Sequence, residues 1–98
     1  MIRRLVFRQE ARLEFDQAGD WYEAERRGLG QEFLDEIDRL LQSIRVSPQS
    51  YPLVVEDVHK AVAKRFPYSV YFRQRSDLIV VLAIFHSARN PAHWQRRT

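Results

Sequence analysis

Residues 8–47 read RQEARLEFDQAGDWYEAERRGLGQEFLDEIDRLLQSIRVS, and this stretch decides the fold. Its apolar residues recur every three or four positions, the spacing of one face of a helix. The two apolar series are Ala11, Phe15, Ala18 and Tyr22, and then Phe33, Ile37, Leu40, Leu41 and Ile44. Between them, Gly28-Leu29-Gly30 interrupts the pattern and supplies the permissive backbone of a tight turn. Two amphipathic helices joined so closely must lie antiparallel, which predicts a hairpin over about 8–47 whose apolar face needs a cover.

A sheet is predicted to supply that cover, over about residues 53–86, where the period of the pattern shortens to about two residues. Val58 to Phe66 alternates imperfectly, and Tyr68 to Arg73 alternates cleanly between two faces. Leu78 to Phe85 is apolar on both faces, which is typical of a central strand. Ile2 to Phe7 is rich in branched apolar residues and is predicted to be a short strand.

Together these elements predict an α+β fold in the order β-α-α-β-β-β. The N-terminal strand and the helical hairpin are expected to pack on a twisted, mainly antiparallel sheet. A length of 98 residues suits a single domain over residues 1–98. Residues 87–98 follow the sheet as a basic tail with room for one helical turn.

Composition excludes several classes of protein. The sequence has no cysteine, which excludes disulfides, thiolate chemistry and cysteine-ligated zinc. No apolar run approaches the ~20 residues of a membrane-spanning helix. The first residues lack the long apolar stretch and cleavage site of a secretory signal. We therefore expect a cytoplasmic protein with no membrane contact.

Charge is segregated along the chain. Residues 1–8 hold three arginines and no acid, residues 9–57 hold twelve acids and five bases, and residues 58–98 hold eight bases and one acid. Fourteen of the sixteen bases are arginine, the side chain best suited to planar contacts with phosphate or carboxylate. A solvated surface is the simplest interpretation of each segment, but the segregation favours an anionic partner for the basic part.

The sequence offers few of the familiar catalytic or cofactor-binding motifs. It has no glycine-rich phosphate loop, and its three histidines lack the i, i+4 spacing of a helical zinc pair. No cofactor and no metal are expected. The acidic side chains of the helices are assigned to their solvent-facing sides: Glu10, Glu14, Glu25, Asp35, Glu36 and Asp38.

The remaining candidates form a basic sheet and tail with aromatic residues among them. They are His59, Lys60, Lys64, Arg65, Arg73, Arg75, His86, Arg89, His93, Arg96 and Arg97, with Tyr68, Tyr71 and Trp94. Such a surface suits phosphate, stacked bases or a protein groove. It would also permit metal-free RNA cleavage, in which His or Tyr moves protons and Arg or Lys stabilises the phosphoryl anion. His86 and Arg89, at the end of the central strand, are the best placed for that chemistry.

Structural interpretations of the same residues stay open. His86 can be a strand-end histidine bonded to a carbonyl, and Trp94 can be a lid that packs over the edge of the core. Arg65 and Arg73 can be solvated strand residues.

Several blocks of the sequence resemble the ParE/RelE toxin superfamily, also called plasmid-stabilisation proteins. The resemblance covers nearly the whole chain, with the blocks in order and at fitting spacing, and the family fold is a helical hairpin on an antiparallel sheet. The blocks are Trp21-Tyr22-Glu23, the run from Gly28 to Phe33, Pro48 with Tyr51-Pro52, Arg65-Phe66-Pro67-Tyr68, and the run from Leu82 to Pro91 with Trp94.

The resemblance implies the toxin of a type II toxin–antitoxin system, neutralised by a cognate antitoxin that wraps the hairpin and sheet. RelE-like members cleave mRNA on the ribosome, which would assign catalysis to Arg65, His86 and Arg89. Trp94 stands where those nucleases often carry a proton-transferring Tyr, and Ser69 stands where they often carry an Arg. Both departures favour the ParE-like branch, whose members inhibit DNA gyrase.

We therefore expect a gyrase-binding toxin without catalysis of its own. Its target-binding residues would be Lys64, Arg65, Arg73, His86, Arg89, Trp94, Arg96 and Arg97. The alternatives are a ribosome-dependent endoribonuclease and an inactive homologue that only binds antitoxin. The sequence leaves the oligomeric state open.

Overall fold

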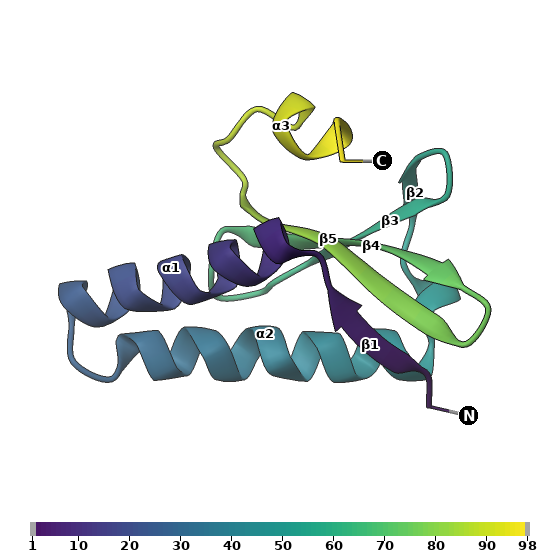
Figure 1. Cartoon of the computed structure of the whole chain (residues 1–98). Helices are drawn as coiled ribbons and strands as arrows, with labels where there is room; N and C mark the ends of the chain where they lie inside the picture. Colours follow the sequence, from purple (N-terminus) through teal and green to yellow (C-terminus); the bar gives the residue numbers. More distant parts are fainter. Residues whose placement is uncertain (1, 98) are drawn as a thin grey trace.

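The computed structural model describes residues 2–97 and places a helical hairpin against a five-stranded sheet, with a short third helix beyond the sheet (Figure 1). In chain order the elements are β1 (Arg4–Phe7), α1 (Gln9–Glu25), α2 (Leu29–Val46), the 3-10 turn η1 (Pro48–Ser50), β2 (Leu53–Val55), β3 (Val58–Val62), β4 (Tyr68–Arg75), β5 (Leu78–His86) and α3 (Ala92–Gln95). Within residues 2–97, no helix combines the length and apolar character needed to cross a membrane.

The sheet has the strand order β1-β5-β4-β3-β2. β1 runs parallel to β5, and the other three neighbouring pairs are antiparallel. The predicted α+β fold with a mainly antiparallel sheet is therefore confirmed. β5 lies between β1 and β4, and its sequence is apolar on both faces because the hairpin core covers one face and Trp94 packs on the other.

The C-terminal sheet contains one strand more than the sequence pattern indicated. β2 (Leu53–Val55) pairs with β3 through a two-residue turn in which Glu56 has a φ of 45°. Such a turn usually contains glycine or asparagine, whereas this one is formed by Glu56 and Asp57, so the sequence pattern did not predict the hairpin. β3 also ends at Val62 instead of continuing to Phe66. The five residues between β3 and β4 form a turn that returns the Phe66 side chain to the core.

The two helices meet closely at their connecting turn. Gly28 has a φ of 87°, a left-handed conformation that glycine adopts without strain. Its N–H and that of Gly30 donate to the Glu23 carboxylate, at 3.0 Å each to the nearer oxygen, so α1 caps the start of α2. A Cβ at Gly30 would lie 2.5 Å from the carbonyl oxygen of Gly19, which explains why this position has no side chain.

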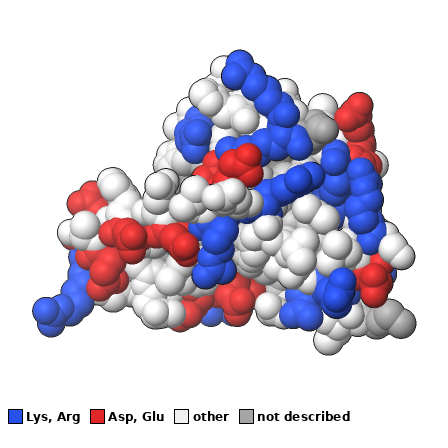
Figure 2. Space-filling view, viewed as in Figure 1, with Lys and Arg blue, Asp and Glu red and all other residues white. Residues whose placement is uncertain are grey.

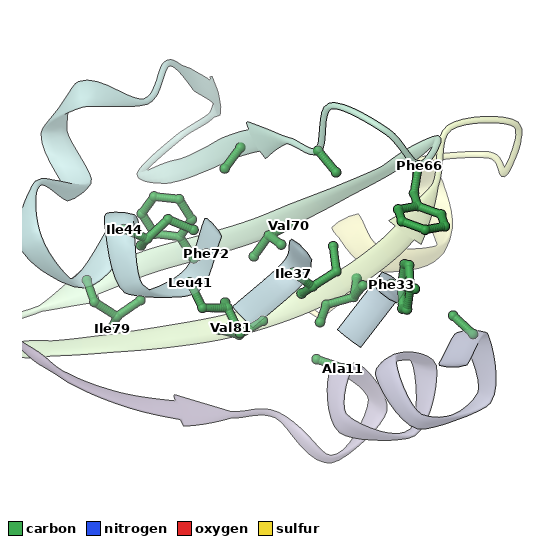
Figure 3. Close-up of a cluster of buried hydrophobic side chains, with 14 of the residues drawn as sticks. Ala11, Phe33, Ile37, Leu41, Ile44, Phe66, Val70, Phe72, Ile79 and Val81 are labelled. Carbon is green, nitrogen blue, oxygen red and sulfur yellow. The ribbon is translucent and has the colours of Figure 1, made fainter. Parts of the chain in front are cut away.

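The main core lies between the hairpin and one face of the sheet (Figure 3). Phe33 is at its centre, with rings of Phe15, Tyr22, Phe66 and Tyr68 within 6.1 Å of its own. The sheet contributes Val70, Phe72, Ile79, Val81 and Ile84, all at most 1% exposed. One face of the sheet thus covers the apolar faces of α1 and α2, as the sequence predicted.

A β-bulge in β5 divides its residues between the two faces of the sheet. Phe72 of β4 pairs with Val81, whereas Tyr71 pairs with Ala83, so Leu82 is the extra residue. Before the bulge the odd-numbered residues of β5 join the hairpin core, and after it the even-numbered Ile84 does. A bulge shifts the side-chain alternation by one residue, and Leu82 and Ala83 both lie on the face away from the hairpin.

Candidate functional site

Basic and acidic side chains occupy different parts of the molecule. In Figure 2, acidic side chains lie mainly along the helical hairpin at the left, and basic ones gather toward α3 and the strands. On this face the charge segregation of the sequence is largely kept in space, apart from acidic groups beside the tail and at the strand end. The face of the sheet away from the hairpin, which we call the far face, and the tail that crosses it form the candidate site.

The tail is docked on the far face by Trp94. This side chain is 1% exposed and packs with Val58, Leu82 and Phe85. Its indole stacks on Tyr71, with ring centroids 4.1 Å apart and an interplanar angle of 26°. The Trp94 side chain is therefore not available to a target in this structure, although we had expected Trp94 to be a target-binding residue. Its burial supports the alternative interpretation, a lid over the core.

Glu14 of α1 connects the hairpin, the central strand and the tail. Arg97 donates to both of its carboxylate oxygens, at 3.1 Å and 2.8 Å, and also to the carbonyl oxygen of Leu82 at 3.0 Å. The N–H of Ile84 donates to Oε1 at 3.1 Å, and Arg89 lies 3.5 Å from Oε2. The Glu14 side chain is 11% exposed. The prediction that Glu14 faces solvent is wrong, because Arg97, 83 positions later in the chain, packs over it.

Asp57 organises a second ionic cluster, at the other end of the far face. Arg73 lies 3.1 Å from one of its oxygens, and Arg75 donates to the other. The hydrogen bond from Arg75, together with the nearby charge of Arg73, lowers the pKa of Asp57. The Arg73 side chain is only 11% exposed, and its Nε has no protein acceptor within the described residues 2–97. Arg73 is thus built into the structure instead of being a solvated strand residue.

Lys64 and Arg65 lie in the turn between β3 and β4, and α2 holds this turn. Both backbone N–H groups donate to Glu36 Oε2, at 2.9 Å and 2.8 Å. The Arg65 guanidinium binds Glu32 at 2.8 Å, and this hydrogen bond lowers the pKa of the Glu32 carboxyl. We had expected Glu36 to be only a solvated helix residue, whereas it also accepts hydrogen bonds from the turn. The Lys64 side chain stays exposed.

His86 ends β5 beside Tyr68. The two rings meet edge to face with centroids 5.2 Å apart. His86 Nδ1 accepts the N–H of Ala88 at 3.0 Å, so it caps the turn that leaves the strand. The structural interpretation had expected a bond to a carbonyl, whereas the partner is an amide. Burial raises the pKa of the Tyr68 hydroxyl.

The three residues expected in a nuclease have separate hydrogen-bond and ion-pair partners. Within residues 2–97, no hydrogen bond or ion pair links Arg65 with His86 or Arg89. Arg65 pairs with Glu32 and Arg89 with Glu14, so each cation already has a carboxylate partner. Arg89 also lies over the Phe85 ring, 4.0 Å from its centroid. Among the tail cations, Arg96 is exposed and forms no ion pair within the described part of the chain.

Comparisons with known proteins agree with this architecture. Residues 5–91 match the family described as the ParE toxin of the type II toxin–antitoxin system parDE. The chain belongs to the ParE toxin family. A solved structure described as the chromosomal ParDE toxin–antitoxin system of P. aeruginosa is similar in fold, with a TM-score of 0.76 and 19% sequence identity. The similarity covers 87% of this chain and 96% of that one. No curated protein gives a match.

The ParE family match ends at Pro91, immediately before α3. The family match therefore carries no information on the docking of Trp94 and Arg97. Within residues 2–97 of this ParE family member, no group of three or more metal-ligating side chains comes together. Three residues that sequence reasoning missed hold the basic residues in place: Glu14, Glu36 and Asp57. No local sequence pattern marks these three residues, because their partners lie far away in the chain.

Proposed function

We propose that this chain is a growth-inhibiting toxin that acts in the cytoplasm by binding DNA gyrase and that a cognate antitoxin neutralises it. Membership of the ParE family is the observation that carries the proposal. The positions of the basic residues support it, because the residues expected to carry out cleavage are held by different elements: Arg65 pairs with Glu32 of α2, and Arg89 pairs with Glu14 of α1.

The surface proposed to contact gyrase is the C-terminal end of β5 together with the tail. Its accessible basic side chains are Arg89, His93 and Arg96, with His86 half-buried at its base. Lys64 is exposed in the turn before β4 and adds a further positive charge to this surface. A positively charged patch of this kind speeds the encounter with an acidic protein surface and helps to select it.

A supercoiling assay with purified gyrase tests the proposal. The wild-type chain should inhibit supercoiling or trap cleaved DNA, while mRNA on programmed ribosomes stays intact. Arg96→Ala should weaken the inhibition several-fold, because Arg96 is exposed and has no ion-pair partner within residues 2–97. Arg27→Ala, which removes an exposed arginine at the hairpin turn, is the matched control and should inhibit like the wild type.

Three outcomes separate the candidates. Cleaved mRNA with unaffected supercoiling would identify a nuclease. Normal growth on overexpression, with neither activity, would indicate an inactive homologue. Equal potency of Arg96→Ala and the wild type would move the gyrase contact away from the tail.

The antitoxin is proposed to bind the hairpin and sheet, where the molecule offers acidic and basic surfaces side by side. Exposed apolar side chains mark the β2–β3 edge, namely Leu53, Val54 and Val62. A groove of about 520 Å³ lies between α2 and the end of β3 with the turn that follows it. Truncation after Pro91 should abolish growth inhibition while the truncated chain still co-purifies with the antitoxin encoded beside it. Loss of both properties together would place the antitoxin on the tail.

A further inference from the structure

Among the described residues 2–97, no strand lies beside the C-terminal half of β5 on the β1 side. β1 ends at Phe7, opposite Val81. Beyond this point, side chains satisfy the backbone groups of β5: Glu14 accepts the N–H of Ile84, and Arg97 donates to the carbonyl of Leu82. Glu14 and Arg97 thus satisfy two backbone groups of β5 at a place where the sheet has an open edge.

The other contacts of the tail are few. α3 has four residues, too short to be stable without packing. Trp94 is its one fully buried side chain, and the indole N–H has no protein acceptor within residues 2–97, which offsets part of the gain from burial. The packing of Trp94 on Tyr71, Leu82 and Phe85 and the ion pairs of Glu14 together keep the tail on the sheet.

We propose that Glu14 is the positioning residue of the tail: its carboxylate holds Arg97 and Arg89, keeps Trp94 seated on Tyr71 and so presents Arg96 and His93 to the target. The relevance of this role to gyrase rests on the function proposed above. Glu14 itself is nearly buried and does not contact the target.

The charge of Glu14 is the essential property. Two guanidinium groups converge on this carboxylate, and the Arg97 side chain is only 15% exposed. Replacing the carboxylate by an amide leaves two like charges together, one of them largely buried without a counter-charge. The tail then relieves the penalty by leaving the sheet, which returns Arg97 to water.

Trp94 fluorescence measures the docking directly. The chain has two tryptophans, so Trp21→Phe in every protein leaves Trp94 as the sole reporter. Glu14→Gln should shift the emission to the red and raise acrylamide quenching several-fold, toward the value of a solvent-exposed indole. Glu10→Gln removes the same charge from an exposed position one turn earlier on α1 and is the matched control. It should leave both readings unchanged.

Two further variants separate positioning from a general loss of structure. Arg97→Gln alone should also undock Trp94, because it leaves the largely buried Glu14 carboxylate without its bidentate counter-charge, which Arg89 at 3.5 Å replaces only in part. Glu14→Gln combined with Arg97→Gln should restore much of the Trp94 burial, because no unpaired charge is then buried. Emission and quenching in Glu14→Gln equal to those of Glu10→Gln would overturn the proposal. So would a double variant no better docked than Glu14→Gln, since simple unfolding predicts that result.

Gyrase inhibition, measured on the same proteins, connects docking with function. Glu14→Gln should lose inhibition to the level of truncation after Pro91, and the double variant should recover part of it. If the wild type does not inhibit gyrase, the proposed function fails while the fluorescence still decides the positioning role. If Trp94 undocks but inhibition is unchanged, the tail has no part in target binding and the proposal is overturned.

Discussion

The two faces of the sheet are covered in different ways. On the hairpin side, two long helices bury a continuous set of apolar side chains with Phe33 at its centre. On the far face, a four-residue helix places Trp94 over a smaller cluster, and ion pairs from Glu14 and Asp57 surround it. The hairpin side therefore supplies most of the stability, whereas the far face is held by a few contacts that single substitutions can remove.

The largest effect is expected at the centre of the hairpin core. Phe33 is 0% exposed and contacts four aromatic rings. Phe33→Ala should lower the free energy of unfolding by about 3–5 kcal/mol, because it removes buried apolar area and leaves a cavity. Urea unfolding measures the change. A loss below about 1 kcal/mol, at the low end for a buried residue, would show that the hairpin core is not the main source of stability.

The hairpin turn should be the next most sensitive site. A Cβ at Gly30 meets the Gly19 carbonyl, whereas one at Gly28 meets nothing within 4 Å. Gly30→Ala should cost about 1–3 kcal/mol by overpacking. Gly28→Asn is the control, since asparagine tolerates the left-handed conformation at that position. Thermal unfolding compares the two variants, and equal melting temperatures would rule out close approach as the reason for Gly30.

Trp94→Ala tests the far face directly. Burial alone would predict a loss as large as for Phe33→Ala, but the tail can leave the sheet without unfolding the hairpin core. We expect a loss of about 1–2 kcal/mol, in the middle of the range for single substitutions. Hydrogen exchange should show faster exchange confined to the far face and the tail. A loss equal to that of Phe33→Ala, with exchange raised throughout, would make the two faces one cooperative unit.

The smallest effect should come from Asp57, and it should depend on pH. Its folded pKa is lowered, chiefly by the hydrogen bond from Arg75, so the stabilisation is present in full above the unfolded pKa of about 3.9 and is lost as pH falls through the folded value. The side chain is 45% exposed, so Asp57→Asn should cost only about 0.2–1 kcal/mol at neutral pH. The difference from the wild type should shrink in acid. If the difference in unfolding free energy between Asp57→Asn and the wild type persists at low pH, the charge of Asp57 is not the source of that difference.

Sequence patterning anticipated the elements that bury a regular stripe. The hairpin, the alternation of Tyr68–Arg73 and the central position of Leu78–Phe85 were all predicted correctly. It did not anticipate β2, because a three-residue strand is too short to show a period and its turn lacks a glycine. The bulge at Leu82 was equally hidden, since every residue around it is apolar and a one-residue shift leaves such a pattern unchanged.

The candidate site was harder to predict from the sequence than the fold, because its key contacts join residues that are far apart in the chain. Arg65, Arg73, Arg89 and Arg97 were singled out for their charge, but each has a carboxylate partner that no local pattern identifies. Glu14 looked like an ordinary solvent-facing helix residue. Only the arrival of the tail, over eighty residues later, buries it.

The sequence by itself determined the class of fold, the segregation of charge and the resemblance to the ParE family, because these depend on periodicity, composition and short motifs. The tertiary structure alone decided which charges are neutralised, which aromatic side chain is buried and where the tail lies. The physical reason is that pairing and burial depend on distances between residues far apart in the chain. Trp94 and Glu14 acquire their roles only when α1, β5 and the tail meet.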